Sequence, residues 1–315
     1  MRPAPLALAP ALALAACTVS GPQQCPSLAR PTARSEVAAV LVPATNQIYA
    51  LGGQGPNIPS NQLWRYSFGA CGGWTELMPA SNPGPRANYA AAFDDMRNRI
   101  IYIGGAAIND VWALSTDDIT FTKLAAVGSP PVDAASEMAV YDDMHDRVIY
   151  AGIETYELDF GDSDQGSWMF IDGNSLQVPA SGVYDPTRST LFARDLVGVH
   201  GFSLFTSTWH DVAESGDLPT SGAELVWYDQ NSEPLAVADG VWIGALDALG
   251  NDIVWNALPT TNAPPARTSF AVAVSGTVLW LSGGVRADGC TFDDLWTLDL
   301  ETGTWTNVWP ATTCS

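Results

Sequence analysis

Short apolar segments that end in a pair of glycines recur along the chain. Segments 47–53, 99–105 and 277–284 read QIYALGG, RIIYIGG and TVLWLSGG, and segment 147–152, RVIYAG, ends in a single glycine. Runs of β-branched and aromatic residues that are bounded by glycine predict buried β-strands. Their recurrence at intervals of about 50 residues indicates an internal repeat.

A fixed order of polar and apolar positions surrounds each complete glycine pair. An arginine opens an apolar strand before each pair: Arg34, Arg86 and Arg267. After the pair and a variable loop come two polar residues, an apolar residue and a tryptophan, at 61–64, 109–112 and 293–296. A further aromatic residue lies in the strand after that. The order predicts four short strands per unit, connected as a meander.

The middle of the chain carries a weaker version of the same pattern. Segment 93–104, FDDMRNRIIYIG, matches segment 141–152, YDDMHDRVIYAG, at an offset of 48 residues. Aromatic-Asp turns at 184–185 and 228–229 precede two further apolar strands. Aspartate favours such a turn because its side chain bonds the nearby backbone. We place the starts of six units near Arg34, Arg86, Ala134, Ser181, Gly222 and Arg267.

The glycine pair followed by spaced aromatic residues resembles the signature of the kelch-repeat family, whose period is about 50 residues. The resemblance covers nearly all of residues 34–315 and is most specific in the first, second and last units. It implies an all-β fold, a six-bladed kelch-type β-propeller with four antiparallel strands per blade. One such unit cannot bury both faces alone, but six units around an axis can. The glycines then allow close approach near the axis, and the tryptophans pack between blades.

Composition limits the possible partners and cofactors. The chain has 315 residues and a formal net charge of −21. Nucleic acids and anionic membranes bind basic surfaces, so this charge argues against both as partners. The three histidines are scattered over the units, unlike the gathered ligands of the copper radical oxidases among kelch-like propellers. The acidic turn at 159–166 lacks the full spacing of an EF-hand calcium loop. We expect no metal and no cofactor.

The first residues predict export. Residues 6–16 are rich in alanine and leucine and are too few to span a bilayer. The small residues before Cys17 resemble the lipobox of a bacterial lipoprotein signal peptide. The resemblance implies that residues 1–16 are removed as a signal peptide and that Cys17 is lipidated. An ordinary secretory signal with a nearby cleavage site is the alternative.

The lipobox resemblance also implies a domain order and a location. Residues 17–33 form a lipidated tether, and residues 34–315 form the propeller. The lipid anchor alone holds the protein at the membrane. By analogy with enteric bacteria, Thr18 after the cysteine implies an outer-membrane lipoprotein, and the side of the membrane is left open.

Four further cysteines predict two disulfide bonds in an exported chain. They are Cys25, Cys71, Cys290 and Cys314. All lie in or beside the first and last units, which are neighbours in a closed ring. A meander brings Cys290 and Cys314 to the same face, so we favour Cys290–Cys314 together with Cys25–Cys71. The pairing Cys25–Cys314, which would staple the ring directly, stays open. A metal site lacks the short cysteine spacing that zinc ligands have.

Three arginines are candidates for a ligand-binding site. Arg34, Arg86 and Arg267 each open the innermost strand of a blade, so a propeller would bring them to one rim of the central channel. Converging guanidinium groups can hold a carboxylate or another anion. The alternative is that each arginine pairs with a nearby acid or with carbonyls of a neighbouring blade.

Two functions remain open. The first is a non-catalytic binding or scaffolding propeller, a monomer that recognises a protein or a glycan through the loops of one face. We favour it because the sequence offers no evident nucleophile–base arrangement. The second is a carbohydrate-active enzyme, similar to the sugar mutarotases and oxidases among bacterial kelch proteins, with its site at the channel mouth. Fold alone does not decide between them.

Overall fold

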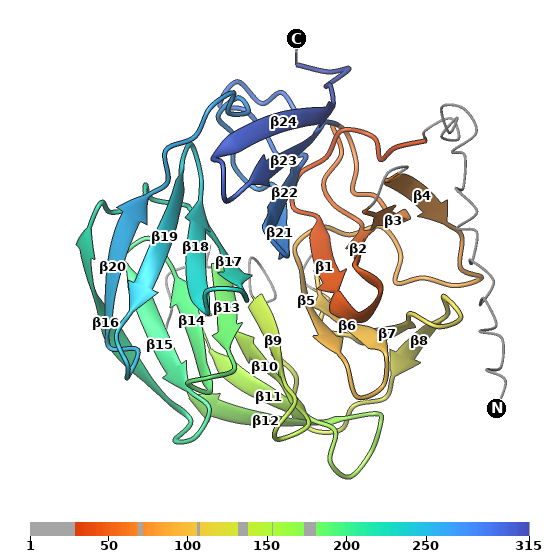
Figure 1. Ribbon diagram of the computed structural model, residues 1–315. Coiled ribbons are helices and arrows are strands. Elements are labelled where there is room, and N and C mark those ends of the chain that lie inside the picture. The colour runs from red at the N-terminus through yellow and green to blue at the C-terminus, as the bar shows by residue number, and fades with distance from the viewer. Residues whose placement is uncertain are drawn as a thin grey trace, which may run out of the picture.

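The protein is a ring of four-stranded antiparallel meanders (Figure 1). The computed structural model describes residues 29–68, 72–105, 108–131, 138–152, 154–172 and 181–314. Within these ranges the strands form six consecutive meanders, which we number as blades 1 to 6. One short 3-10 helix, η1 (Pro43–Thr45), lies in the first hairpin. The predicted signal peptide and most of the predicted tether lie outside the described residues.

The strands of each blade follow one another in the chain. Blade 1 has β1 (Ala38–Val42), β2 (Gln47–Leu51), β3 (Leu63–Ser67) and β4 (Gly73–Leu77). Blade 2 has β5 (Tyr89–Asp94), β6 (Arg99–Gly104), β7 (Val111–Ser115) and β8 (Phe121–Leu124). Blade 3 has β9 (Met138–Asp142), β10 (Arg147–Ala151), β11 (Thr155–Asp159) and β12 (Ser167–Asp172). Blade 4 has β13 (Ser181–Asp185), β14 (Thr190–Arg194), β15 (Val199–Ser203) and β16 (Thr208–Gly216). Blade 5 has β17 (Glu224–Tyr228), β18 (Glu233–Val237), β19 (Val241–Leu246) and β20 (Asp252–Ala257). Blade 6 has β21 (Ala271–Ser275), β22 (Val278–Ser282), β23 (Leu295–Asp299) and β24 (Thr304–Trp309).

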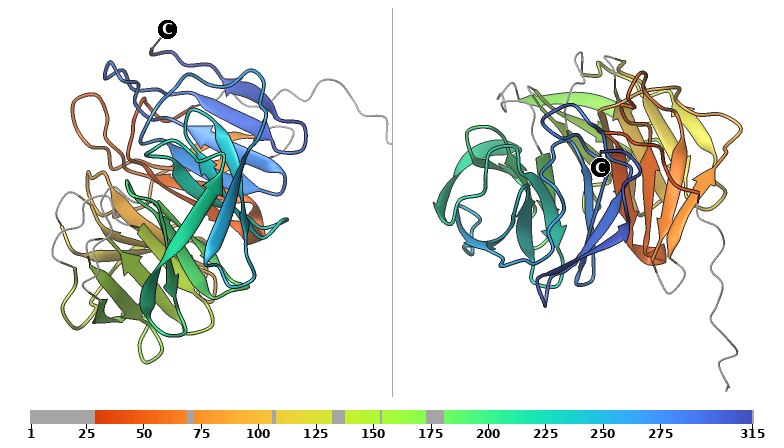
Figure 2. Two further views of the ribbon diagram at one scale, coloured as in Figure 1. Left: turned by 90° about the vertical axis from the view of Figure 1, so that its left-hand side faces the viewer. Right: turned by 90° about the horizontal axis from the view of Figure 1, so that it is seen from above.

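The first strands of the blades surround the axis of the ring. They contact one another in the cyclic order β1, β5, β9, β13, β17, β21 and back to β1. Each begins within four residues of a predicted unit start. Figure 2 shows the ring from two perpendicular directions, with the green to light-blue strands β13–β20 opposite the orange to yellow strands β1–β8. The predicted all-β propeller with antiparallel blades is confirmed.

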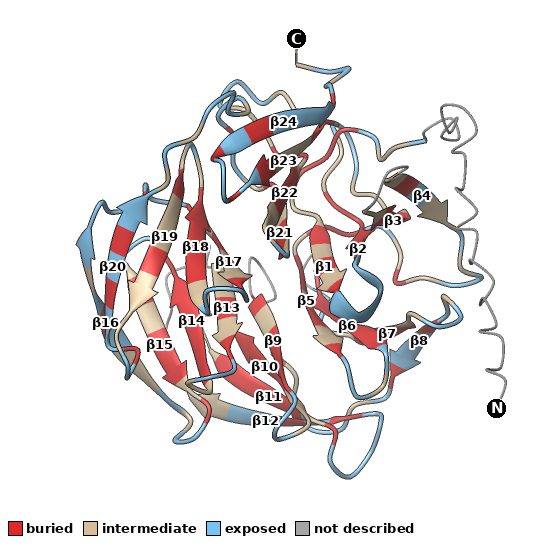
Figure 3. Cartoon of the chain, viewed as in Figure 1, coloured by how far each residue is buried: buried red, intermediate tan, exposed pale blue. Residues whose placement is uncertain are grey.

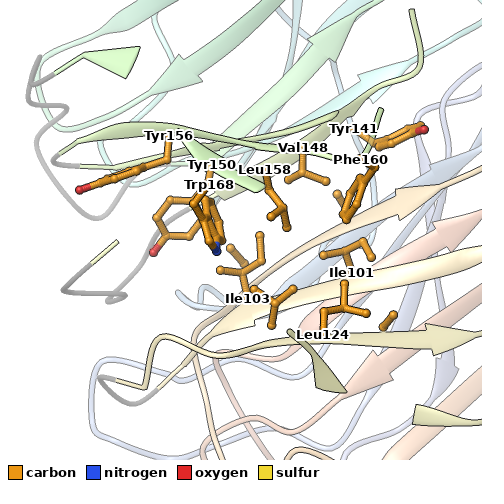
Figure 4. Packing of buried hydrophobic residues seen from close by; sticks show 14 residues of the cluster. Ile101, Ile103, Leu124, Tyr141, Val148, Tyr150, Tyr156, Leu158, Phe160 and Trp168 are labelled. Atoms are coloured by element: carbon orange, nitrogen blue, oxygen red, sulfur yellow. The ribbon is translucent and has the colours of Figure 1, made fainter. Parts of the chain in front are cut away.

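The hydrophobic core is divided among the junctions between blades. Among the described residues, each of six clusters of buried side chains draws on two neighbouring blades. At the junction of blades 2 and 3, Ile101 and Ile103 face Tyr150 and Leu158 (Figure 4). Burial of one such side chain stabilises the fold by about 1.5–3 kcal/mol. A single blade would expose both of its faces, so the core exists only when the blades meet.

Burial falls from the second strand of a blade to the fourth. The second strands β6 and β14 are buried at every position, because neighbouring blades cover both of their faces. The fourth strands β12, β20 and β24 keep a few buried side chains between exposed ones, because they lie at the rim (Figure 3). The continuous apolar segments of the sequence are therefore the most buried strands.

The glycine pairs bring neighbouring blades into main-chain contact. Gly53 of blade 1 donates its N–H to the carbonyl of Arg86 in blade 2, at 3.0 Å. Gly284 of blade 6 likewise donates to the carbonyl of Arg34 in blade 1, at 2.9 Å. A Cβ on Gly52, where φ is +69°, would lie 2.4 Å from the Arg86 carbonyl oxygen. The predicted close approach at the glycine pairs is confirmed.

The ring closes between blades 6 and 1 through the segment before β1. In the described part of the chain, the four strands of each of these blades come from one continuous segment. Arg30 donates to the carbonyl of Pro310 at 2.7 Å and lies 5.8 Å from the centre of the Trp309 ring. Deeper in the junction, the rings of Trp74 and Trp280 meet edge to face, with centroids 5.6 Å apart. Side-chain contacts and main-chain hydrogen bonds, such as that from the N–H of Arg34 to the carbonyl of Phe292 at 3.1 Å, thus close the ring together.

Blades 4 and 5 are joined in a second way. Their outermost strands, β16 and β20, pair in parallel where residues 213–216 lie against residues 252–255. The two blades therefore form one eight-stranded sheet. Pairing satisfies two strand edges that would otherwise be open to solvent. Nothing in the repeat pattern predicts this contact.

Candidate functional site: the central channel

Two adjoining cavities run along the axis of the ring. The smaller, of about 220 Å³, is lined by the first residues of the inner strands, and we call it the channel mouth. The larger, of about 400 Å³, is lined by the middle and last residues of the same strands. Ala39, Ala91, Ala139 and Gly182 line both cavities, so the two form one channel.

The side chains that line the larger cavity are mostly apolar, although about half of its lining surface is polar. Ala91, Val140, Val183 and Val272 are typical members. Each inner strand pairs on one side only, with the second strand of its own blade. The backbone N–H and C=O groups of its other edge therefore turn toward the channel or the neighbouring blade. The channel can accept an apolar body and a few hydrogen-bonding groups.

One carboxyl group lines the channel mouth. Glu224 is the first residue of β17, and the hydroxyl of Ser181, the first residue of β13, hydrogen-bonds its carboxylate. The Ser181 hydroxyl oxygen in turn accepts the backbone N–H of Leu225. Burial raises the pKa of Glu224, the Ser181 hydrogen bond lowers it, and the result is about 7. The group therefore changes its charge near neutral pH.

The sequence analysis missed Glu224. Val37, Tyr89 and Phe270 line the mouth at the corresponding position of blades 1, 2 and 6. A carboxyl group where other repeats carry an apolar or aromatic side chain is the signal that could have found it. The signal was hidden because blade 5 lacks the glycine pair that fixes the repeat register.

The three predicted arginines lie inside their blades. Each is at most 6% exposed. Each donates, at 2.9–3.0 Å, to the carbonyl of the first glycine of its own blade's pair: Arg34 to Gly52, Arg86 to Gly104 and Arg267 to Gly283. None of the three is among the residues that line the two channel cavities.

An aspartate completes this arrangement in blade 6. Arg267 donates to the two carboxylate oxygens of Asp294 at 2.5 and 2.8 Å. The same carboxylate accepts the indole N–H of Trp296 at 2.8 Å. A single buried acid thus satisfies an arginine and the tryptophan of the repeat.

Blade 2 repeats the arrangement with Asp110. Its carboxylate accepts from Arg86 and, at 3.0 Å, from the indole N–H of Trp112. Burial opposes the charge on Asp110. This effect is outweighed by hydrogen bonds from Arg86, Trp112 and Lys123 and by the charge of Arg86. Together they hold the pKa of Asp110 below its ordinary value. The acid therefore stays ionised at neutral pH.

Blade 1 has an amide at this place. Arg34 donates to the side-chain oxygen of Gln62 at 2.5 Å, and the amide nitrogen of Gln62 donates to Glu76 at 2.9 Å. Burial lowers the pKa of Arg34 to about 10, although the charge of Glu76 raises it. The indole N–H of Trp64 has no hydrogen-bond partner among the described residues. Gln62 therefore satisfies the arginine but not the tryptophan.

These contacts match the alternative interpretation, in which each of the three arginines pairs with a nearby acid or with carbonyl groups. Each pairs with an acid, an amide or carbonyls within its own blade, and the structure does not bring the three together at the channel. A role for Arg34, Arg86 and Arg267 in ligand binding stays a prediction. Glu224, Ser181 and Tyr89 are the charged and polar side chains that line the channel mouth.

One predicted disulfide bond is present. Cys290, in the loop after β22, is bonded to Cys314, which follows β24. The prediction Cys290–Cys314 is confirmed, and the rival pairing of Cys314 with Cys25 is wrong. Cys17, Cys25 and Cys71 lie outside the described residues, so Cys25–Cys71 stays a prediction.

Within the described residues, the side chains that commonly bind metal ions do not form a metal centre. No group of three or more His, Cys, Asp and Glu residues within them is placed to hold a metal ion. In the acidic turn after β11, Asp159 accepts the backbone N–H of Gly161 at 2.8 Å and so stabilises the turn itself.

No described helix is long and apolar enough to cross a bilayer.

Comparisons with known proteins agree with the repeat framework. A family model described as the kelch motif matches residues 266–308, which cover blade 6. The solved structure of YjhT is similar with a TM-score of 0.61 and 12% sequence identity, over 89% of this chain and 98% of that chain. The curated protein sequences include no match. Similarity extends to 702 chains of known structure, so the fold by itself selects no function. The ring of meanders and the similarity to YjhT make the fold of this chain a β-propeller, and its last blade carries a kelch motif.

Proposed function

We propose that the protein is a non-catalytic binding or scaffolding propeller that recognises a protein or a glycan through one face of the ring. This is the mouth face, at which the inner strands begin. Each first strand runs away from this face and each second strand returns to it. The mouth face therefore carries the loops between second and third strands and the connections between blades. Loops held on a rigid scaffold are common binding elements.

The observation that carries the proposal is the exposure of large apolar side chains on mouth-face loops. Ile58, between β2 and β3, is 72% exposed, and Ile108, between β6 and β7, is 43% exposed. Leu196 and Val197, between β14 and β15, are 54% and 67% exposed. Several such groups on the loops of one face are typical of a binding surface.

The second candidate function is a carbohydrate-active enzyme with its site at the channel mouth. One observation favours it: the pKa of Glu224 lies near 7, where a carboxyl group can give and take a proton. An enzyme of this kind would also need a partner group for the substrate, and the described lining of the two cavities includes no arginine or lysine. Binding is therefore the function we favour.

A binding screen tests the proposal. The full chain with Cys17→Ser is applied to a glycan array and used to capture proteins from a cell-envelope extract. We expect a ligand whose retention falls at least about tenfold in the double variant Ile58→Asp, Ile108→Asp, since two buried apolar contacts are worth that much. Phe205→Asp is the matched control, because Phe205 is 81% exposed in the turn after β15, on the opposite face. Equal retention by both variants would reject the mouth face.

We also propose that the propeller is exported and held at the bacterial outer membrane by lipid on Cys17, as a monomer. The support is the alanine- and leucine-rich segment that precedes Cys17. Labelling of cells with radioactive palmitate tests the anchor. Wild type should be labelled and Cys17→Ser should not, and equal labelling would contradict the anchor.

A further inference from the structure

We propose that the channel binds a small organic ammonium ion with an apolar body. The ammonium group sits against Glu224 in the channel mouth, and the hydrocarbon part lies in the larger cavity behind it. The site is separate from the loop surface of the proposed function and does not depend on it. The two cavities, the position of Glu224 and the charges around it carry the inference.

The mouth is built to present a carboxylate. Ser181 on β13 bridges two groups of β17, since its oxygen accepts the N–H of Leu225 and its hydroxyl bonds the carboxylate of Glu224. A hydroxyl that donates to a carboxylate favours the charged form and fixes its orientation. The carboxylate keeps further lone pairs for an ammonium group, which is a donor of three hydrogen bonds.

No described residue in the lining supplies the opposite charge. Among the described residues, neither a lysine nor an arginine lines either cavity. Tyr89 of β5 is the other titratable group in the lining of the mouth, and its hydroxyl donates to the carbonyl of Gly84 at 3.2 Å. Glu224 is therefore a half-buried acid without a cation, which is why burial raises its pKa to about 7. A bound ammonium ion would supply the missing charge.

The space behind the mouth offers apolar side chains between polar backbone groups, and a short alkyl chain can pack against the apolar ones. The larger cavity, of about 400 Å³, adjoins the mouth and is lined mostly by alanine and valine. Asp229 is the acidic residue in its lining, and it follows the last residue of β17, at the far end of the channel from Glu224. A ligand with its charge at one end and an alkyl chain behind it matches this order. The net charge of −21 attracts cations toward the molecule.

Calorimetric titration with n-hexylammonium chloride tests the site on the full chain carrying Cys17→Ser. We expect one ion bound per chain. The affinity should rise about tenfold between pH 6 and pH 8 as Glu224 loses its proton, because the ammonium group stays charged over this range. Glu224→Gln should weaken binding at pH 8 at least about tenfold and remove the dependence on pH.

Two controls distinguish binding at Glu224 from binding elsewhere on the acidic surface and from purely hydrophobic binding. Glu301→Gln removes an exposed carboxylate in the turn after β23 and should leave the affinity unchanged. n-Hexanol has the same chain without the charge and should bind more weakly, with no dependence on pH. Equal binding of hexanol and hexylammonium, an affinity unaffected by Glu224→Gln, or no binding of hexylammonium at all would overturn the proposal. If Glu224→Gln fails to fold, the pH dependence of the wild type and the hexanol titration still decide.

Discussion

Blade 6 and the junction of blades 4 and 5 use the same chemistry in different ways. In blade 6 the carboxylate of Asp294 holds Arg267 and the indole of Trp296, and all three belong to one blade. At the other site Glu214 of β16 accepts Arg194 at 2.6 Å and the indole N–H of Trp255 at 2.8 Å. Arg194 and Glu214 belong to blade 4, but Trp255 belongs to blade 5.

Arg267 and Arg194 also share a second kind of contact, a hydrogen bond to a proline carbonyl. Arg267 also donates to the carbonyl of Pro265 at 3.1 Å, and Arg194 donates to the carbonyl of Pro219, also at 3.1 Å. Both prolines lie in the connection that leads into a blade. The same set of groups, an acid, an arginine, a tryptophan and a proline carbonyl, thus recurs at different positions of the repeat. Asp294 is buried, and Glu214 is partly buried.

The difference shows what the repeat motif achieves. Blade 1 has Gly52 and Gly53 after its second strand, and blade 4 has Asp195 and Leu196 there. Blades 1, 2 and 6 have the glycine pair, and each satisfies its arginine inside the blade. In blades 2 and 6 an aspartate also accepts the indole N–H of the tryptophan. Blades 4 and 5 lack the glycine pair, and between them β16 and β20 pair in parallel over four residues and the partly buried Glu214 spans the junction. The rim between blades 2 and 3 and the rim between blades 5 and 6 carry one parallel bridge each.

Loss of the acid in blade 6 should have the largest effect on stability. Asp294→Asn leaves Arg267, whose side chain is 1% exposed, without its counter-charge. Breaking a buried pair of this kind costs about 3–5 kcal/mol. Urea unfolding followed by tryptophan fluorescence measures the change. Asp117→Asn, at an exposed turn residue, is the matched control and should change the free energy of unfolding by less than about 0.5 kcal/mol.

Loss of the acid between blades 4 and 5 should cost less. The side chain of Glu214 is 15% exposed, so solvent compensates part of the loss. We expect Glu214→Gln to lower the free energy of unfolding by about 2–3 kcal/mol, the range for hydrogen bonds to a charged group. Glu301→Gln serves as the control. A cost equal to that of Asp294→Asn would mean that the junction is as closed to water as blade 6.

The stability of the junction between blades 4 and 5 should also depend on pH, through Glu224 at its inner end. Glu224 bridges to Ser181, and its pKa is about 7 in the folded protein against an ordinary value of 4.5. The folded state therefore holds the proton more tightly than the unfolded state, and this stability is lost as pH rises from about 4.5 through 7. Glu224→Gln stays neutral and should be more stable than wild type by about 2 kcal/mol at pH 8, after a discount for its access to the channel.

Melting temperatures of the two proteins from pH 4 to pH 8 test this prediction. The curves should meet at pH 4, where the wild-type carboxyl is protonated in both states, and separate as pH rises. A constant difference across the range would contradict a raised pKa of Glu224.

The smallest effect is expected in blade 1. Gln62→Ala removes one hydrogen bond to Arg34, which keeps the carbonyl of Gly52 and the hydroxyl of Ser60. We expect a loss of about 1 kcal/mol, the usual value for one hydrogen bond. Urea unfolding beside Asp294→Asn gives the comparison. An equal loss in both variants would show that the charge of Asp294 adds nothing.

The sequence alone was sufficient to predict those features whose physical cause lies within a short stretch of the chain. The glycine pairs revealed the second strands of blades 1, 2 and 6. In blades 1 and 6 a Cβ on the first glycine would collide with a backbone carbonyl of the neighbouring blade. The spacing of Cys290 and Cys314 around one meander was enough to pair them.

The remaining features depend on contacts between distant residues. Glu214 lies 20 residues from Arg194 and 41 residues from Trp255, and none of the three occupies a motif position. The arginines of the motif were expected at the channel rim because their acids could not be assigned without the fold. Glu224 acquires its raised pKa only from the channel that the six inner strands enclose.

Native-state hydrogen exchange compares most directly the acid that acts within blade 6, Asp294, with the acid that links blades 4 and 5, Glu214. In Glu214→Gln, exchange should accelerate in both segments 208–216 and 252–257, because the acid spans two blades and supports the parallel pair. In Asp294→Asn, the acceleration should be confined to segments 271–309 of blade 6. Acceleration of segment 208–216 alone in Glu214→Gln, with segment 252–257 unchanged, would contradict the claim that one partly buried acid, Glu214, links blades 4 and 5.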